Sequence, residues 1–354
     1  MLKEEEIEIA EKLGFEETLL NEVILKGECA GCGACVTVCP FNVLEYSEKP
    51  NLVDECKNCG ICMKVCPRYS WSWPEMEKFV FGRERKEDEE FGIYKKLFIA
   101  QSTDNRILQV CQDGGVATSL LISAIQNGLI DAAIETRINP EKPLMPNPKI
   151  AESIPEILEC AGTSYIYSPN LLALKEAVGK KNLAVVGVPC QIHAIRKIQA
   201  SSLKKYANPI KFTIGLMCTE SFQYKGLIED FLIKKFEIDP SDVKKMNIKG
   251  KLLVYLKKGQ IKEIPLKETK AYVREGCCHC DDFSNELADI SLGGLGLNQW
   301  TFTIIRTEKG EEIFREAEKN GLIRVKEIEE DSFPMKLLLR LSRNKRKRGM
   351  DKDR

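Results

Sequence analysis

Near its amino terminus the chain reads Cys29-Ala-Gly-Cys32-Gly-Ala-Cys35-Val-Thr-Val-Cys39-Pro40 and then Cys56-Lys-Asn-Cys59-Gly-Ile-Cys62-Met-Lys-Val-Cys66-Pro67. Both stretches are complete C-x2-C-x2-C-x3-C-P runs. The two-residue gaps wrap three thiolates around one face of an iron–sulfur cube, and the fourth Cys begins a helix and points to the other cube. The two runs therefore predict two [4Fe–4S] clusters, each bound by four thiolates.

This spacing is the bacterial ferredoxin pattern, which assigns the ligands in two crossed sets. We expect the first cluster site to consist of Cys29, Cys32, Cys35 and Cys66, and the second of Cys56, Cys59, Cys62 and Cys39. Small residues between the ligands leave backbone N–H groups free to hydrogen-bond the sulfides. A zinc ribbon is the alternative, but zinc sites seldom carry eight cysteines at this spacing and do not explain the two prolines.

The composition of the whole chain restricts its function further. Its 354 residues carry 53 basic and 53 acidic side chains, so the formal net charge is zero and nucleic acid is a poor default partner. The hydrophobic fraction of 43% suits a buried core. No apolar stretch is long enough to span a membrane, and the acidic start lacks the apolar region of a signal peptide. We therefore expect a soluble, cytoplasmic protein without an integral membrane segment.

The order of these motifs predicts an α+β or α/β chain, in which a bacterial-type ferredoxin domain over 26–74 precedes a larger mixed-sheet domain over 97–330. Residues 1–25 have amphipathic helical spacing and are expected to form a solvated helical extension. A charged run without apolar period marks 75–96 as a linker or surface strap. Residues 331–354 are expected to form a short helix and a basic tail that is solvated or faces a partner.

The larger domain has the apolar pattern of a sheet with helices around it. Residues 119–125 predict a helix, whereas the short apolar runs 183–188 and 212–217 are typical of buried strands. Residues 252–256 precede a Lys-Gly turn and Ile261, which predicts a hairpin.

A third cluster site is predicted in this domain. Cys190 and Cys218 directly follow the two apolar runs, and Cys277 and Cys280 form a further C-x2-C pair. In open α/β sheets the carboxyl ends of the strands converge on the crevice where ligands bind, so the four thiols can meet there. Zinc, or His279 as a ligand, is the alternative that residue types leave open.

Three of the fifteen cysteines remain outside these sets of four. An odd number of cysteines excludes complete disulfide pairing within the chain, and thiols in a cytoplasmic protein are more often metal ligands. We expect Cys111 and Cys160 to be packing residues and Cys278 to lie beside the third cluster without binding it.

A flavin-sized site is predicted around Gln112-Asp113-Gly114-Gly115-Val116-Ala117-Thr118, which opens a helix with two glycines. Such a turn lets backbone N–H groups approach a phosphate, although paired glycines before a helix are also common turn chemistry. Three polar, glycine- or serine-containing segments accompany it, at 161–165, 167–170 and 289–296. The chain has no G-x-G-x-x-G motif, which disfavours a standard Rossmann site.

From about Leu97 to Glu330 the chain resembles the coenzyme F420 hydrogenase/dehydrogenase β-subunit family. The resemblance rests on Ser102-Thr103-Asp104, Gln112-Asp113-Gly114-Gly115, Ala161-Gly162-Thr163, Ser168-Pro169-Asn170, Val188-Pro189-Cys190-Gln191, Gly215-Leu216-Met217-Cys218-Thr219-Glu220-Ser221-Phe222 and Glu286-Leu287-Ala288-Asp289-Ile290-Ser291. With the ferredoxin module in front, the chain looks like the electron-input subunits of archaeal F420H2-linked complexes.

The resemblance implies an FAD enzyme that exchanges hydride with its substrate coenzyme F420 and passes single electrons through three [4Fe–4S] clusters. The family's cluster ligands fall on the four cysteines of the third site. Its flavin-contacting segments fall on Asp113, Gly114, Gly115, Thr118, Thr163, Tyr165, Ser168, Asn170 and Gln191. The turn at 296–300 is shorter than the family's usual turn, which bears on the shape of the deazaflavin pocket.

The implied partner is another oxidoreductase. The candidates are a hydrogenase, a formate dehydrogenase, a heterodisulfide-reductase-type complex, a sulfite reductase and a respiratory complex of archaeal methanogenesis. Such a partner would place the chain in the cytoplasm or at the periphery of a membrane complex.

Two other functions remain open. One is a ferredoxin-dependent reductase of a tetrapyrrole in the chlorophyll pathway. The other is a non-catalytic electron-wiring subunit, which would contain about eight iron atoms and no flavin.

Overall fold

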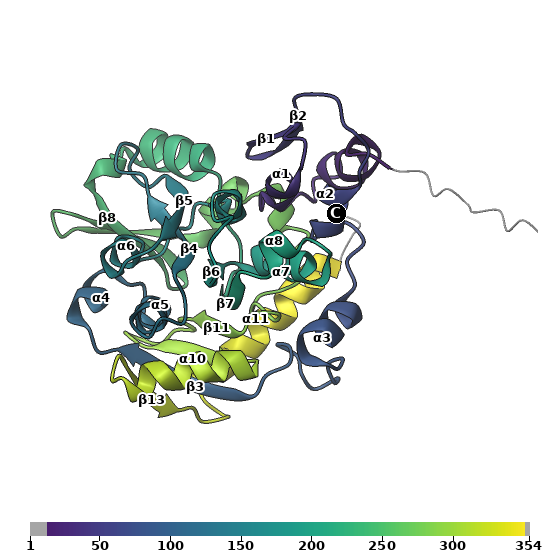
Figure 1. Cartoon of the computed structure of the whole chain (residues 1–354). Coiled ribbons are helices and arrows are strands. Elements are labelled where there is room, and N and C mark those ends of the chain that lie inside the picture. Colours follow the sequence, from purple (N-terminus) through teal and green to yellow (C-terminus); the bar gives the residue numbers. More distant parts are fainter. Residues whose placement is uncertain (1–12, 351–354) are drawn as a thin grey trace, which may run out of the picture.

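The computed structural model describes residues 13–350. A small lobe that carries the two ferredoxin cysteine runs stands beside a larger lobe, which is built on an eight-stranded sheet (Figure 1). The predicted mixed-sheet domain is therefore confirmed. Within the described residues, no helix is both long and apolar enough to cross a membrane.

In the small lobe each cysteine run contains a short helix that begins after the second Cys and ends at the fourth, because Cys39 and Cys66 are the C-caps of the two helices. The expectation that the fourth Cys begins a helix is therefore wrong. The segment between the runs forms an antiparallel pair of strands in which Leu44 lies opposite Leu52. The elements are η1 (Glu16–Ile24), α1 (Ala34–Val38), β1 (Leu44–Ser47), β2 (Lys49–Leu52), α2 (Ile61–Val65) and α3 (Trp73–Phe81).

Two expectations for the flanks of this lobe are wrong. Phe15, Leu19 and Val23 are buried against the cysteine-bearing segments, so residues 13–25 are an integral part of the core rather than a solvated extension. The rest of that predicted extension, 1–12, lies outside the described residues. The helix α3 occupies the start of the predicted linker, because Ser72 caps its first turn by accepting a hydrogen bond from the Glu75 N–H group at 3.4 Å.

The large sheet has the strand order β13-β3-β12-β11-β7-β6-β4-β5. Its centre, β11-β7-β6-β4, is parallel, and the remaining neighbours pair antiparallel. The predicted strands at 183–188 and 212–217 are β6 and β7. The eight strands are β3 (Lys96–Ser102), β4 (Ala132–Ile138), β5 (Pro146–Ala151), β6 (Leu183–Gly187), β7 (Ile210–Leu216), β11 (Ile290–Gly293), β12 (Thr301–Ile305) and β13 (Ile323–Glu327).

Helices cover both faces of this sheet (Figure 1). The side chains of successive strand residues point to opposite faces of the sheet, so Ala184 packs in the core on one face and Val185 in the core on the other. One face packs against α4 (Asn105–Val110), α5 (Val116–Gln126), α6 (Ile154–Glu159) and α10 (Glu308–Lys319). The other packs against η2 (Asn170–Lys175), α7 (Pro189–Ala200) and α8 (Lys204–Ala207), and through them against α1 and α2 of the small lobe.

A smaller three-stranded sheet adds a third core around Phe231 and Val254. The predicted hairpin is confirmed, because Ile261 pairs antiparallel with Tyr255. Its elements are η3 (Lys225–Ile233), α9 (Lys234–Phe236), η4 (Pro240–Asp242), β8 (Val243–Ile248), β9 (Lys251–Leu256), β10 (Ile261–Pro265), η5 (Leu266–Tyr272) and η6 (Glu275–Cys277).

The carboxyl-terminal basic segment is not a free tail. It belongs to the long helix α11 (Phe333–Met350), in which Lys345 is only 3% exposed and donates a hydrogen bond to the Thr219 carbonyl. Arg346 forms an ion pair with the buried Glu286 at 2.6 Å. The expectation of a solvated or partner-facing tail is therefore wrong for these residues, whose charges are used inside the fold.

Candidate iron–sulfur and flavin sites

The third cluster site forms at the carboxyl edge of the parallel strands. Cys190 lies in the first turn of α7 after β6, and Cys218 follows β7. Burial raises the pKa of the Cys218 thiol to about 12, and the neighbouring thiols of Cys277, Cys280 and Cys190 act in the same direction. The four cysteines that the sequence assigned to one site therefore lie together, although they are up to 90 positions apart.

Polar groups of the larger lobe reach the sulfurs of this site. The Ser221 N–H group donates to Cys277 Sγ at 3.4 Å, and the Tyr167 hydroxyl lies 3.5 Å from Cys190 Sγ. The Ser221 hydroxyl lies 3.9 Å from Cys218 Sγ. Hydrogen bonds of this kind stabilise negative charge on the sulfurs and are one of the means by which proteins set cluster potentials.

The first cluster site lies at the contact between the two lobes, where Cys32 packs in a core shared with the larger lobe. The pKa of Cys35 is raised well above its ordinary value by burial and then by the thiols of Cys32, Cys66 and Cys29. Burial also raises the pKa of Cys32, which Cys66 and the third-site thiol of Cys190 raise further. The first and third sites are therefore direct neighbours across the contact between the lobes.

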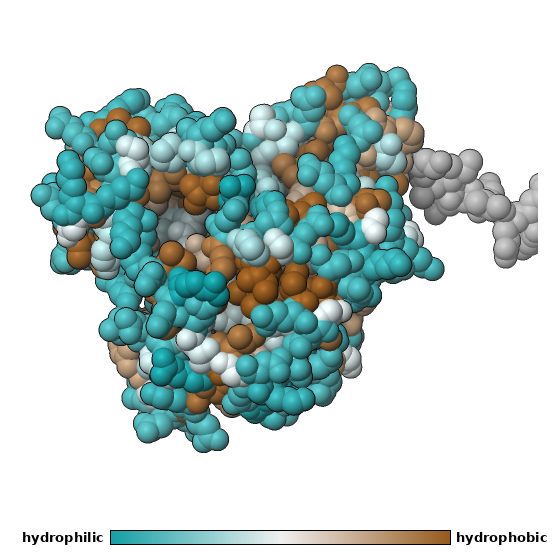
Figure 2. Space-filling view, turned by 60° about the vertical axis from the view of Figure 1, so that its left-hand side comes forward, coloured by the Kyte–Doolittle hydropathy of each residue, from teal (hydrophilic) through white to brown (hydrophobic). Residues whose placement is uncertain are grey.

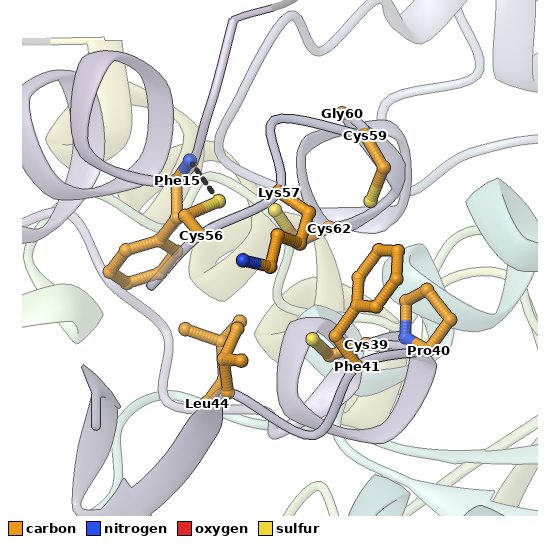
Figure 3. Close-up of a pocket in the computed structure, with 11 residues that line it drawn as sticks. Phe15, Cys39, Pro40, Phe41, Leu44, Cys56, Lys57, Cys59, Gly60 and Cys62 are labelled. Carbon is orange, nitrogen blue, oxygen red and sulfur yellow. Dashed lines mark hydrogen bonds between the residues drawn. The ribbon is translucent and has the colours of Figure 1, made fainter. Parts of the chain in front are cut away.

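The second cluster site is a pocket with about 330 Å³ of space free of protein atoms, a volume that includes open solvent at its mouth (Figure 3). Cys39, Cys56, Cys59 and Cys62 all line it, together with Phe15, Phe41, Lys57 and four further residues. Burial raises the pKa of Cys62 to about 12, with contributions from the neighbouring thiols. The Phe15 N–H group donates to Cys56 Sγ at 3.5 Å. Four thiols around one cavity, with a backbone donor on one sulfur, are the surroundings that a cubane requires.

This second site opens toward the surface. Cys59 is exposed, whereas Cys32 and Cys35 of the first site are buried. Figure 2 shows apolar side chains reaching the surface of the small lobe, and Phe41 and Val53 are each about half exposed there.

No three His, Cys, Asp or Glu side chains within residues 13–350 are arranged as ligands of a single metal ion. A cubane makes a different demand, since each thiolate binds a separate iron at its own corner of the cube.

The glycine turn predicted for a flavin lies against the ends of three strands. The Gly114 N–H group donates to Thr301 Oγ1 at 3.0 Å, and a Cβ atom at Gly114 would lie 2.6 Å from the Ala100 carbonyl oxygen. Asp113 lies so close to Gly294 that a Cβ there would be 2.3 Å from its carboxylate. The predicted segments 112–118 and 289–296 are therefore brought together. Burial raises the pKa of Asp113 to about 6.

The other predicted flavin residues lie along the same edge. Gln191 Nε2 donates to the Ser168 carbonyl at 2.6 Å, and Asn170 Nδ2 donates to the Val186 carbonyl at 3.2 Å. The Tyr165 hydroxyl accepts a hydrogen bond from Gln112 Nε2 at 2.9 Å, which links this group to the glycine turn. Thr118 is buried in the first turn of α5, whereas Thr163 is exposed.

One buried atom in this group lacks a partner. Ser168 Oγ makes no hydrogen bond within the described structure. A buried hydroxyl without a partner costs free energy, and a polar ligand would satisfy it. The unpartnered Ser168 hydroxyl therefore fits a site for a polar cofactor, whereas the packing at Gly114 is against the protein's own Ala100 and Thr301.

Sequence reasoning missed several residues near these sites. Glu135 lies on β4 with a buried Oε1 atom that has no partner, and burial raises the pKa of its carboxyl group to about 8. Arg68 and Arg274 were also missed, although each lies within three positions of a predicted ligand, which is the signal that could have found them. Cys111 is a core residue, as predicted, and Cys278 is exposed.

Comparison with known proteins agrees with this arrangement. Residues 97–175 match the family described as "Coenzyme F420 hydrogenase/dehydrogenase, beta subunit N-term", and residues 180–331 match the family that describes the carboxyl-terminal part of the same β subunit. Residues 28–71 match the "4Fe-4S dicluster domain".

Relatives and a solved structure point the same way. The coenzyme F420 hydrogenase subunit beta of Methanosarcina barkeri is 39% identical over 73% of this chain and 91% of its own length. The coenzyme F420-dependent sulfite reductase of Methanocaldococcus jannaschii is 38% identical over 88% of this chain, which spans half of that longer protein. A chain of the F420-reducing [NiFe] hydrogenase complex from Methanosarcina barkeri superimposes with a TM-score of 0.71 at 37% identity, covering 75% of this chain and 93% of that one. The protein therefore belongs to the coenzyme F420 hydrogenase/dehydrogenase β-subunit family and carries a 4Fe–4S dicluster domain in its amino-terminal part.

Proposed function

We propose that this chain is the F420-oxidoreducing, electron-transferring subunit of a larger oxidoreductase. When bound, FAD exchanges hydride with coenzyme F420, and three [4Fe–4S] clusters carry single electrons to or from a partner protein. The observation that supports this most strongly is the arrangement of the twelve assigned cysteines. They form three adjacent groups, which lead from the carboxyl edge of the large sheet to the surface of the small lobe.

The chain's own residues would give each site a different task. The third site lies beside the predicted flavin segments, since Cys190 and Gln191 share the first turn of α7. In the first site Cys32 and Cys35 are buried and Cys29 and Cys66 are half-buried, which limits the access of water to its sulfurs. The second site ends the series at the surface with the exposed Cys59, where a partner can approach.

The flavin would be held at the carboxyl edge of the sheet. The turn at Gly114 and Gly115 precedes the eleven-residue helix α5, whose first N–H groups favour an anionic phosphate. The polar groups of Asp113, Thr118, Thr163, Tyr165, Ser168, Asn170 and Gln191 would contact the rest of the cofactor. No general acid or base is assigned, because hydride and electron transfer do not require one.

The partner would be an oxidoreductase of the kinds named above, and the relatives favour a hydrogenase or a sulfite reductase. We further propose that the chain works in the cytoplasm. We expect no nucleic-acid partner, because the formal net charge of the chain is zero.

The test is anoxic purification, reconstitution with iron, sulfide and FAD, and analysis of cofactor content and activity. We expect about twelve iron atoms per chain, one flavin, and bleaching of that flavin by F420H2 faster than by NADH. Absence of bound flavin, or equal rates with F420H2 and NADH, would overturn the proposal. About eight iron atoms and no flavin would instead identify an electron-wiring subunit.

A further inference from the structure

The first and third cluster sites meet where each lobe sends one arginine into the cysteine loop of the other. Arg68 comes from the small lobe, two positions after Cys66. Its Nη1 donates to the His279 carbonyl at 2.8 Å and its Nη2 lies 3.4 Å from the Gly276 carbonyl, so the guanidinium group spans the loop that carries Cys277 and Cys280.

Arg274 makes the reciprocal contact from the larger lobe. It precedes Cys277 by three positions, and its Nη1 donates to the Ala30 carbonyl at 2.9 Å, inside the first cysteine run. The side chain is buried, with its guanidinium carbon 3.9 Å from the ring centre of Tyr167, whose hydroxyl lies 3.5 Å from Cys190 Sγ.

Two glycines permit this close approach. A Cβ atom at Gly276 would lie 2.2 Å from the Cys29 carbonyl oxygen, and a Cβ at Gly31 would lie 2.2 Å from Arg274 Nη2. Since real Cβ atoms do not approach other heavy atoms so closely, a larger residue at Gly276 would force the two cysteine loops apart, and a larger residue at Gly31 would displace the Arg274 guanidinium group. The sequence therefore keeps the two ligand loops in direct backbone contact.

Neither guanidinium group has a carboxylate partner among its hydrogen bonds in the described structure, and Arg68 Nε is buried without any partner. A buried cation without a counter-ion is costly unless negative charge lies nearby. Burial lowers the pKa of both arginines, but nearby groups outweigh it. Cys280, Cys190 and then the Asp281 carboxylate raise the pKa of Arg68. Tyr167, Cys277, Tyr46 and Cys190 raise the pKa of Arg274. Thiols of the cluster sites are therefore among the negative groups that face both guanidinium groups.

We propose that Arg68 and Arg274 form an electrostatic bridge between the first and third clusters, which raises the reduction potentials of both and holds them in register for electron transfer. A tetrathiolate cluster is anionic and gains one further negative charge on reduction, so a fixed cation beside it favours the reduced form. The two arginines act on the clusters as positioning and tuning residues. The inference rests on the proposed function, because it requires a cluster at the third site.

The test is a redox titration of the reconstituted full-length protein, monitored by electron paramagnetic resonance. We expect Arg68→Gln and Arg274→Gln each to shift the midpoint potentials of the first and third clusters to more negative values, with a smaller shift at the second. Arg68→Lys and Arg274→Lys should restore most of the lost potential because they keep the charge. Arg315→Gln, which removes an exposed arginine on α10, is the matched control and should shift none.

Unchanged potentials in glutamine variants that retain their iron would overturn the bridge, and so would lysine variants that shift as far as the glutamine ones. If a glutamine variant loses iron, its potentials cannot be compared, and the test then rests on the lysine variant. The midpoint potentials of the lysine variant should stay close to those of the unmodified protein. A clear negative shift of these potentials would contradict the proposal. Failure of the proposed function has a different signature, since the unmodified protein would then lack bound flavin or would react with F420H2 no faster than with NADH.

Discussion

The second cluster site differs from the first and third in both exposure and surrounding charge. Its four cysteines line an open pocket and include the exposed Cys59 beside the buried Cys39 and Cys62, whereas none of the eight cysteines assigned to the first and third sites is exposed. Lys57 lines the second site, but the first and third sites are crossed by Arg68 and Arg274 and flanked by two further cations. These are Lys197, whose Nζ donates to the Cys66 carbonyl at 2.9 Å, and the buried Lys345 beside the third site.

This difference shows how one local motif can serve two purposes. The two ferredoxin runs have the same spacing, so their own sequences do not separate a buried site from an exposed one. The contact with the larger lobe covers one site and supplies it with positive charge, while the other is left at the surface. Cluster reduction potentials depend on solvent exposure and nearby charge, so we expect two motifs of the same spacing to hold clusters of different potential.

The largest effect should come from removing a ligand of the third site, which lies beside the predicted flavin segments. We expect Cys218→Ser to lower the iron content by about four atoms per chain and to reduce electron flow from F420H2 to a one-electron dye by roughly a hundredfold or more. Cys59→Ser should also lose about four iron atoms but keep most of the dye reduction, because the first and third sites remain. Iron analysis and dye-reduction rates check both variants. Equal loss of dye reduction in the two variants would break the comparison.

A large effect on stability is expected at the cover of the second site. Phe15 is 1% exposed and lines the pocket. Phe15→Ala removes a buried aromatic ring and should lower the free energy of unfolding by about 3–5 kcal/mol, with faster loss of iron from the second cluster. Chemical denaturation and timed iron release measure the two effects. Phe79→Ala removes a half-exposed ring and is the control; a loss of stability as large as that of Phe15→Ala would contradict this explanation.

A smaller effect is expected where the small lobe is fastened to α7. Lys197 Nζ also donates to the Tyr69 carbonyl at 2.7 Å. Lys197→Met leaves that carbonyl and the carbonyl of Cys66 without a donor, so we expect a loss of about 1–3 kcal/mol in thermal unfolding. The exposed residue Lys204 offers the control variant Lys204→Met, which should change little. An unaltered melting temperature in Lys197→Met would show that the lobes hold together without this contact.

The smallest effect concerns the order in which clusters are lost. Under limited oxygen or an iron chelator, the signal of the exposed second cluster should disappear first, with a rate a few times that of the buried sites. Spectroscopy of samples taken during exposure follows each cluster separately. Simultaneous loss of all three signals would indicate that burial does not protect the inner sites.

Much of the candidate site could be predicted because its chemistry is local. The spacing within 29–39 and 56–66 predicts eight ligands without any knowledge of the fold. The strand-end positions of Cys190 and Cys218 predicted their convergence, because parallel strands present their carboxyl ends at one edge. The glycine turn before α5 was predictable for the same reason, since a helix start needs only a few consecutive residues.

The sequence by itself thus predicted which cysteines group together and that a mixed sheet follows the ferredoxin module. Only the tertiary structure decided which cluster site is buried, which cations face it, and that Lys345 of the basic segment packs beside the third site. Arg68 and Arg274 each make their key hydrogen bonds to residues more than 200 positions away. Ligand spacing is a property of neighbouring residues, whereas burial and charge at a site arise from chain segments that meet only when the fold is complete.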